Sequence, residues 1–176
     1  MPREENRAFY EALRDIVTEN DIRSYLEIGV QEGDSLKEVL ACGTILRVVL
    51  CDTWGREYGG TGHGNHVHIL PMVRGIESVT FLDGESEFEI PHLEETFDLI
   101  TVDGDHSLMG CLKDLQNCWE ILRPGGFLVI DDLSHPAHLY LDYLFDAFVI
   151  EKDAIIIRHD TETGYGVGVL QKGEDK

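Results

Sequence analysis

Basic side chains are scarce in this sequence of 176 residues, which has 14 Lys and Arg against 34 Asp and Glu and a net charge of −20. Proteins that bind nucleic acids or anionic membranes need clustered positive charge on the binding surface. This sequence has no run of basic residues, so it argues against both kinds of partner. A small molecule is the partner that the composition leaves open.

Long apolar segments and closely paired cysteines are also missing. No segment approaches the roughly 20 apolar residues that span a bilayer, and residues 1–10 (MPREENRAFY) lack the apolar stretch of a signal peptide. The four cysteines show no CxxC spacing, which favours reduced thiols in a protein core: Cys42, Cys51, Cys111 and Cys118. These features indicate a cytoplasmic protein.

Strand-like and helix-like segments alternate along the chain, a pattern typical of an α/β fold with a mostly parallel sheet and helices on both faces. Strands are predicted at 25–30, 46–52, 78–83, 97–103, 126–132, 154–159 and 165–171. Helices are predicted at 5–19, 34–40, 66–76, 107–122 and 139–148. The length fits a single domain, 1–176, with an N-terminal helix inside residues 1–20. The last two strands have no room for a helix between them, so they must pair antiparallel or lie apart.

The clearest helix, at 107–122, has apolar residues at steps of three and four: Leu108, Leu112, Leu115, Trp119 and Leu122. Ser107 is a suitable N-cap, and Pro124 with two glycines ends the helix.

Two features near the first two strands indicate a nucleotide-like ligand. Glu27, Gly29 and Gly33 form an ExGxxxG pattern at the first strand-to-helix turn, where glycines let a ligand approach the free N–H groups of the helix. The spacing differs from the GxGxxG of most dinucleotide binders. Asp52, followed by Thr53, ends the second strand about twenty residues later, where an acidic side chain can accept hydrogen bonds from ribose hydroxyls.

The third strand ends in Asp83, Gly84, Glu85 and Ser86, which could line an adenine pocket or simply turn the chain. The sequence leaves these two interpretations equal.

Carboxylates follow the fourth and fifth strands. Asp103 ends FDLITVD, and Asp131 with Asp132 ends GFLVIDD. Neighbouring parallel strands open on one crevice, so these carboxylates are predicted to meet there and to need a cation such as Mg²⁺. His106, at the start of the next helix, is a candidate general base for a substrate hydroxyl, and Asp105 could cap that helix.

Together, the ExGxxxG turn, Asp52, FDLITVDGDHS and LRPGGFLVIDD resemble the class I S-adenosylmethionine-dependent methyltransferases. Within them the chain is similar to the metal-dependent small-molecule O-methyltransferases of the macrocin and cephalosporin-biosynthesis type, over about residues 25–133. The resemblance implies a Rossmann-like, doubly wound sheet of seven strands in the order 3-2-1-4-5-7-6, with the last strand antiparallel.

The resemblance also implies roles for individual residues. Glu27, Gly29 and Gly33 would border the methionine part of the cofactor, Asp52 would hold the ribose, and Glu85 and Ser86 would approach the adenine. Thr53, Gly84 and Asp103 would also contact the cofactor. Asp103, Asp131 and Asp132 would bind Mg²⁺, and His106 would take the proton of a small-molecule hydroxyl. The acceptor is not inherited from the family, and a homodimer stays open.

Other interpretations of the same residues need separate tests. VDGDHS also fits the nucleophile motif of haloacid-dehalogenase-type phosphatases, with Asp103 as nucleophile and Asp105 as acid, although that motif belongs on the first strand of its fold. A dehydrogenase would need a different glycine spacing. A non-catalytic cofactor-binding partner protein is the third alternative. His63, His66 and His68 could bind a transition metal, but a loop leading into a helix is the preferred interpretation.

Overall fold

The computed structural model describes residues 4–54 and 66–174, and its centre is a seven-stranded sheet with the order β3-β2-β1-β4-β5-β7-β6. The strands are β1 (Ser24–Ile28), β2 (Arg47–Asp52), β3 (Ser78–Asp83), β4 (Phe97–Val102), β5 (Leu122–Asp131), β6 (Ile155–Asp160) and β7 (Val167–Gln171). β7 pairs antiparallel with both β5 and β6, and the other neighbours pair in parallel. This topology confirms the predicted Rossmann-like fold.

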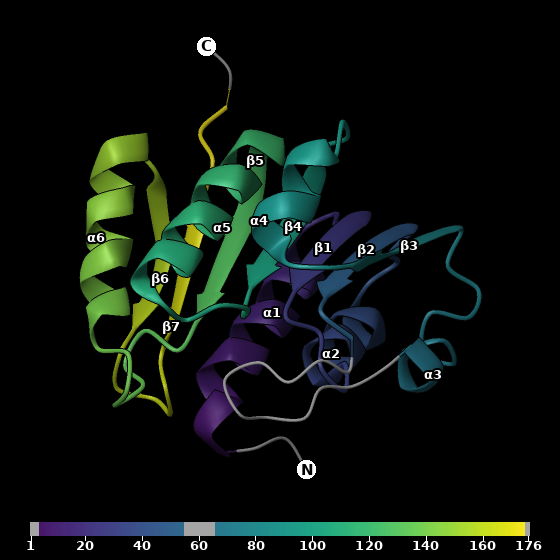
Figure 1. The fold of residues 1–176 in the computed structure, drawn as a ribbon, viewed down its shortest axis with the longest axis horizontal. Coiled ribbons are helices and arrows are strands. Elements are labelled where there is room, and N and C mark those ends of the chain that lie inside the picture. Colours follow the sequence, from purple (N-terminus) through teal and green to yellow (C-terminus); the bar gives the residue numbers. More distant parts are fainter. Residues whose placement is uncertain (1–3, 55–65, 175–176) are drawn as a thin grey trace.

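Helices cover both faces of the sheet (Figure 1). They are α1 (Arg7–Glu19), α2 (Asp34–Cys42), α3 (His66–Ile69), α4 (Ser86–Glu89), α5 (Leu108–Ile121) and α6 (Tyr140–Lys152), with 3-10 turns at Glu4–Asn6 and Ile90–His92. α1 and α2 pack on one face, and α5 and α6 pack on the other. None of the described helices is both long and apolar enough to cross a membrane.

Strand side chains alternate between two buried cores, as expected for a sheet covered on both faces. In β1, Tyr25 belongs to the core under α1 and α2, whereas Leu26 and Ile28 belong to the core under α5 and α6. Glu27 lies on the same side of β1 as Tyr25 because side chains two residues apart share a face. The alternation therefore puts this buried carboxyl under the first helical layer.

Several element boundaries differ from the sequence prediction, and two of these differences have a clear physical cause. The helix predicted at 66–76 is only the single turn α3, because Pro71 lacks the N–H that would continue a helix and Gly75 adopts a φ of +98°. β5 begins before the predicted residue 126. Gly125 N–H donates to the Lys172 carbonyl (2.9 Å) and Lys172 N–H donates to the Gly126 carbonyl (3.0 Å), so the Pro-Gly-Gly segment pairs as strand.

The buried face of α5 also differs from the predicted one. Leu108 is 49% exposed, and the side chains buried against the sheet are Cys111, Asp114, Leu115, Cys118 and Trp119. Ser107 caps the helix as predicted, because its hydroxyl oxygen accepts a hydrogen bond from Gly110 N–H at 3.1 Å. The face that α5 turns to the sheet therefore combines the predicted Leu115 and Trp119 with two thiols and one carboxyl.

Candidate active site

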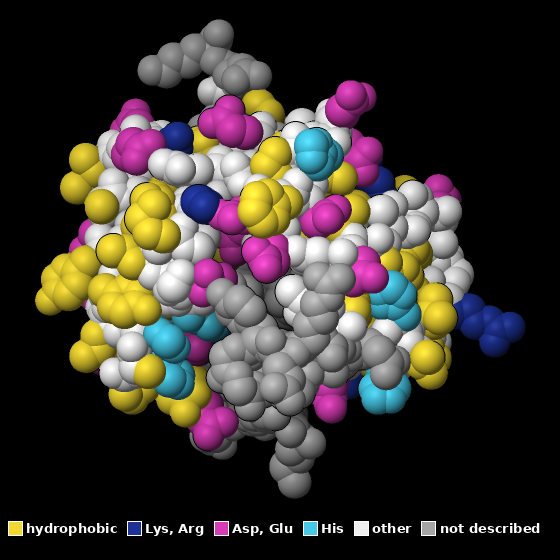
Figure 2. Space-filling model, in the orientation of Figure 1, with side chains coloured by type: hydrophobic (Ala, Val, Ile, Leu, Met, Phe, Trp, Pro, Cys, Tyr) yellow, Lys and Arg dark blue, Asp and Glu magenta, His cyan; other side chains and the backbone are white. Residues whose placement is uncertain are grey.

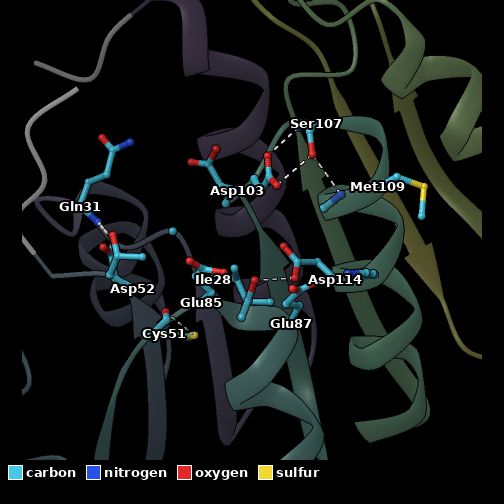
Figure 3. Close-up of a pocket in the computed structure, with 18 residues that line it drawn as sticks. Ile28, Gln31, Cys51, Asp52, Glu85, Glu87, Asp103, Ser107, Met109 and Asp114 are labelled. Carbon is cyan, nitrogen blue, oxygen red and sulfur yellow. Dashed lines mark hydrogen bonds and ion pairs between the residues drawn. The ribbon is translucent and has the colours of Figure 1, made fainter. Parts of the chain in front are cut away.

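A cavity of about 240 Å³ lies at the carboxyl ends of β1, β2 and β4, and Figure 3 shows the side chains around it. The strand order reverses between β1 and β4, so the helices that follow them leave on opposite faces and open a crevice. The lining residues are Ile28, Gly29, Gln31, Cys51, Asp52, Thr53, Gly84, Glu85, Ser86, Glu87, Asp103, Gly104, Asp105, Ser107, Met109, Gly110, Lys113 and Asp114.

Gly29 forms the floor of this cavity at the turn after β1. Its φ is +84°, and its N–H donates to the carbonyl of Cys51 at 3.0 Å. A Cβ at this position would lie 1.9 Å from the backbone carbonyl oxygen of Asp103. Only glycine therefore lets the ends of β1 and β4 approach so closely, and the open backbone is left facing the cavity.

Glu27 and Gly33 support the turn without lining the cavity. Glu27 is fully buried, accepts a hydrogen bond from the Ser35 hydroxyl, and has its pKa raised to about 8 by burial. Gly33 precedes α2 with a φ of +74°, and a Cβ there would meet Ile69 Cδ1 at 2.7 Å. The predicted motif thus divides into one cavity residue, Gly29, and two residues placed outside the cavity wall.

Asp52 joins the end of β2 to the glycine turn. Its carboxylate accepts hydrogen bonds from the N–H of Gln31 (2.8 Å) and of Trp54 (3.0 Å), and the residue is 7% exposed. Asp52 and Thr53 both line the cavity, as Figure 3 shows for Asp52. The two backbone donors fix the direction of the carboxylate at the cavity wall, where it can accept further hydrogen bonds from a ligand.

The cavity wall is strongly acidic. Of its side chains, six carry a carboxyl group and one, Lys113, carries an amine. Lys113 forms an ion pair with Glu87, another wall residue, which largely neutralises the positive charge of Lys113. Figure 2 shows Asp and Glu side chains gathered over this face of the molecule. Gly84, Glu85 and Ser86 line the cavity as predicted, whereas Asp83 does not.

His106 lies between two of the predicted carboxylates. Its Nε2 is 3.4 Å from Asp103 Oδ1 and 3.6 Å from Asp132 Oδ2, so the ends of β4 and β5 do meet as the sequence predicted. Burial lowers the pKa of His106, but the interaction with Asp103 and the charge of Asp132 outweigh it, and the pKa lies above its ordinary value. Asp103 lines the cavity, which puts the imidazole beside the ligand space.

Asp131 is the third of the predicted carboxylates and the most deeply buried of them. It is 1% exposed, and its Oδ2 accepts a hydrogen bond from the Asn6 amide at 3.1 Å. Burial, together with the charges of Asp103 and Asp132, raises the pKa of Asp131 well above its ordinary value. Burial and the charge of Asp103 raise the pKa of Asp132 to about 6. These carboxyls are therefore too crowded and too dry to be fully ionised together.

The predicted histidine loop is only partly within the described residues, and His63 lies outside them. His66 begins α3, as expected for a loop that leads into a helix. Its ring centroid lies 4.4 Å from that of Trp54 and 4.5 Å from that of Phe81. His66 is therefore part of an aromatic cluster beside the end of β2.

Comparisons with known proteins identify the family of this fold and cavity. A sequence profile described as a methyltransferase domain matches residues 26–133, which include the glycine turn and all three predicted carboxylates. The chain belongs to the class I S-adenosylmethionine-dependent methyltransferases. This membership favours methyl transfer over the phosphatase interpretation of Asp103.

Individual relatives of this methyltransferase act on different atoms. It is 30% identical over 92 residues to the ubiquinone/menaquinone biosynthesis C-methyltransferase UbiE of Blochmanniella floridana, an alignment that spans 50% of this chain and 36% of the relative. The N-methyltransferase NodS of Bradyrhizobium japonicum, solved with S-adenosyl-L-homocysteine, superposes with a TM-score of 0.71 at 15% identity and covers 98% and 90% of the two chains.

The O-methyltransferase TomG of Streptomyces achromogenes, solved with S-adenosylmethionine, superposes with a TM-score of 0.70 at 16% identity over 94% and 79% of the chains. The structural likenesses support the fold. The three relatives carry a methyl group to carbon, nitrogen and oxygen respectively, so the acceptor atom of this methyltransferase does not follow from them.

The predicted metal ligands of the methyltransferase meet but do not form a metal-binding arrangement as they are placed. Within residues 4–54 and 66–174, no group of three or more His, Cys, Asp or Glu side chains could hold a metal ion. The imidazole of His106 is positioned between Asp103 and Asp132. The donor chemistry fits a hard cation nevertheless, because Asp131 Oδ1 is buried and accepts no hydrogen bond from any described residue.

Asp114 is one of the cavity residues that sequence reasoning missed, together with Gln31, Glu87 and Lys113. It belongs to α5, is 1% exposed, and lines the methyltransferase cavity beside Ser86. Burial raises the pKa of Asp114 to about 7. A signal was present in the sequence: Asp114 stands three residues after Cys111 and four before Cys118, which places it on their stripe of the helix.

Proposed function

We propose that this methyltransferase transfers the methyl group of S-adenosylmethionine to a hydroxyl group of a small molecule, with His106 as the proton acceptor. The observation that carries the proposal is the position of His106 Nε2, 3.4 Å from Asp103, a residue of the cavity wall. A base at this place is close to an acceptor that binds beside Asp103. Its raised pKa makes the neutral ring a stronger proton acceptor.

The acidic cavity supports a cationic ligand. S-adenosylmethionine, when bound, supplies a methyl group on a positively charged sulfur atom. The six wall carboxyls and the net charge of −20 favour such a ligand and disfavour a polyanion. The same charge balance supports the proposal that nucleic acids and anionic membranes are not partners. A cytoplasmic location and a homodimer remain predictions.

Positioning is the main contribution expected from the protein. Gly29 leaves room for the ligand against the backbone. The Asp52 carboxylate, which two backbone N–H groups already orient, would accept hydrogen bonds from the ribose hydroxyls. Aligning two bound reactants can lower a barrier by roughly 7–11 kcal/mol. Asp103 and His106 would orient the acceptor hydroxyl, and His106 would take its proton.

We also propose that Asp103, Asp131 and Asp132 bind Mg²⁺ near the acceptor. Support comes from their oxygen donors and from the unpartnered Oδ1 of Asp131. A divalent cation at this place would lower the pKa of a neighbouring acceptor hydroxyl. Vicinal diols, such as those of sugars or catechols, suit an acceptor that approaches both His106 and these carboxylates.

Asp52→Ala is expected to weaken binding of S-adenosylhomocysteine about tenfold to a hundredfold, because hydrogen bonds to a charged acceptor are lost. Isothermal titration calorimetry on the two proteins measures this. The matched control is Asp83→Ala. Asp83 of β3 pairs in register with Asp52 of β2, but it is exposed and does not line the cavity. Equal affinity in wild type and Asp52→Ala would remove the ribose role, and a folded wild type without any binding would refute the proposed function.

Asp131→Asn is expected to abolish binding of Mn²⁺, used as a paramagnetic substitute for Mg²⁺, because a neutral amide is a much weaker ligand than a carboxylate. Electron paramagnetic resonance of free Mn²⁺ in a titration gives the number of sites directly. Glu94→Gln, at an exposed position in the turn before β4, is the control for a change of one charge. If wild type and Asp131→Asn bind Mn²⁺ equally, the carboxylate site is refuted and the methyl-transfer proposal stands without it.

A further inference from the structure

The imidazole of His106 has contacts beyond the two carboxylates that flank it. The distances from its Nε2 to Asp103 (3.4 Å) and to Asp132 (3.6 Å) exceed the roughly 3 Å of a good hydrogen bond. Contacts of this length attract the ring without fixing the orientation of its plane. A base that receives a proton from a bound acceptor needs a defined direction, because a misplacement of about 1 Å can cost about a hundredfold in rate.

The ring of His138 packs on the face of the His106 ring. The two ring centroids lie 5.3 Å apart and the planes are inclined by 25°, which is a stacked arrangement. His138 belongs to the segment between β5 and α6, whereas His106 precedes α5, so the contact joins two strand-to-helix connections. Figure 2 shows a group of His side chains on this face of the molecule. Stacking restricts the tilt of the His106 plane, which is the freedom that the carboxylate contacts leave.

Tyr140, the first residue of α6, fixes the two histidines relative to each other. Its hydroxyl donates a hydrogen bond to the backbone carbonyl of His106 at 2.7 Å. The same oxygen lies 3.2 Å from Nδ1 of His138. Because the Tyr140 proton is used on the carbonyl, the Tyr140 oxygen can accept a hydrogen bond from an Nδ1–H of His138. One hydroxyl therefore links the backbone of His106 to the ring that stacks on its side chain.

His138 is itself packed against a third ring. The ring of His135 stacks on it, with centroids 5.0 Å apart and planes inclined by 29°. Nδ1 of His135 accepts a hydrogen bond from Ala137 N–H at 3.1 Å, and the His135 ring packs edge-on against Tyr165 with centroids 4.3 Å apart. These partners hold the ring of His138 in place, so it can act as a fixed platform for the ring of His106.

We propose that His138 is a positioning residue for the general base, and that its ring holds the imidazole of His106 in the orientation that receives the acceptor proton. This inference rests on the proposed function, because it takes His106 as that base. His138 is not among the lining residues of the cavity, so it acts through His106 and not on the reacting atoms. The property required at position 138 is an aromatic ring.

The first test measures methylation of catechol, a vicinal diol, per mole of protein that binds S-adenosylhomocysteine in calorimetry. His138→Ala is expected to lower kcat about tenfold to a hundredfold, while the KM for catechol and the affinity for S-adenosylhomocysteine stay within about twofold of wild type. His138→Phe keeps an aromatic ring on the face of His106 and is expected to restore kcat to within about threefold. His92→Ala removes an exposed histidine from the 3-10 turn after α4 and should keep the wild-type kcat.

A double variant separates an action through His106 from an independent effect. In His106→Gln the ring that His138 positions is gone, so adding His138→Ala is expected to change kcat by less than about twofold. Losses that multiply in the double variant would overturn the proposal, and so would a wild-type kcat in His138→Ala. A merely structural role of His138 would reduce the amount of protein that binds the ligand and leave kcat per binding site unchanged.

A measurement without any acceptor covers the case in which wild type does not methylate catechol. Nuclear magnetic resonance of protein labelled with stable isotopes in histidine reports the His106 ring directly, with its signals assigned by their loss in His106→Gln. These signals are expected to move in His138→Ala, which lacks the ring current of the stacked ring, and to shift back in the same direction in His138→Phe. Unchanged signals in His138→Ala would overturn the proposal. A kcat that His106→Gln leaves unchanged would instead refute the base of the proposed function.

Discussion

Gly29→Ala is expected to abolish measurable binding of S-adenosylhomocysteine and to lower the free energy of unfolding. The added Cβ would lie 1.9 Å from the Asp103 carbonyl oxygen, so β1 and β4 would have to separate where Asp103 N–H donates to the Ile28 carbonyl at 3.0 Å. Overpacking of this kind costs about 1–3 kcal/mol, and an alanine at a φ of +84° adds about 1–3 kcal/mol of backbone strain.

Gly75→Ala separates these two contributions. Gly75 also has a positive φ, +98°, but no atom lies within 4 Å of the position of its Cβ. Urea denaturation should therefore show the strain contribution alone for Gly75→Ala and the sum for Gly29→Ala, and only Gly29→Ala should lose the ligand in calorimetry. If the two variants unfold with the same loss of stability, the close approach of β1 and β4 does not determine the fold at this turn.

The sheet was predictable because its signals are local and repeated. Each strand is a short apolar run between turn residues. The order of the strands was implied by the resemblance of the glycine turn and the two carboxylate motifs to the class I methyltransferases. The helix predicted at 66–76 failed for a local reason, Pro71 and Gly75, whereas the start of β5 depends on a distant partner. The Pro-Gly-Gly segment joins β5 because Lys172, 46 or more residues away, pairs with Gly125 and Gly126, and no local pattern contains that contact.

The candidate site was predictable only where function and backbone geometry coincide. Gly29, Asp52 and Asp103 all line the cavity because strand ends in a parallel sheet converge at the switch point. Glu27 was placed correctly at the turn, but its carboxyl is fully buried and accepts a hydrogen bond from Ser35 of α2. Sequence order alone does not distinguish a carboxyl that lines the cavity, such as Asp52, from one buried outside its wall, such as Glu27.

Asp114 illustrates the opposite failure. A charged residue in an amphipathic helix is normally assigned to solvent, and the leucines at 108 and 112 suggested a different buried face. The structure packs Cys111 and Cys118 inward, as predicted for core thiols, but exposes Leu108. The small thiols leave space for a carboxyl on the same stripe, so the cavity gains a polar group that a leucine face would have excluded.

His106→Gln is expected to reduce the rate of methyl transfer about 10²–10⁴-fold, because a positioned base contributes about that much to proton transfer. Glutamine keeps a polar side chain between Asp103 and Asp132 but cannot take a proton at neutral pH. The affinity for S-adenosylhomocysteine should stay within about twofold of wild type, since His106 is not among the lining residues of the cavity. The rate is measured as S-adenosylhomocysteine formed from S-adenosylmethionine with a panel of vicinal diols.

The comparison of rate with affinity is what makes this result informative. His92→Gln changes an exposed histidine in the 3-10 turn after α4 and should keep the wild-type rate. If His106→Gln lost rate and cofactor affinity together, the imidazole would be holding the ends of β4 and β5 in place, and the proton would need another acceptor. If its rate were unchanged on every diol that wild type methylates, His106 would have no part in the chemistry. A selective loss of rate instead assigns to His106, between two carboxylates, the proton transfer that methylation of a hydroxyl requires.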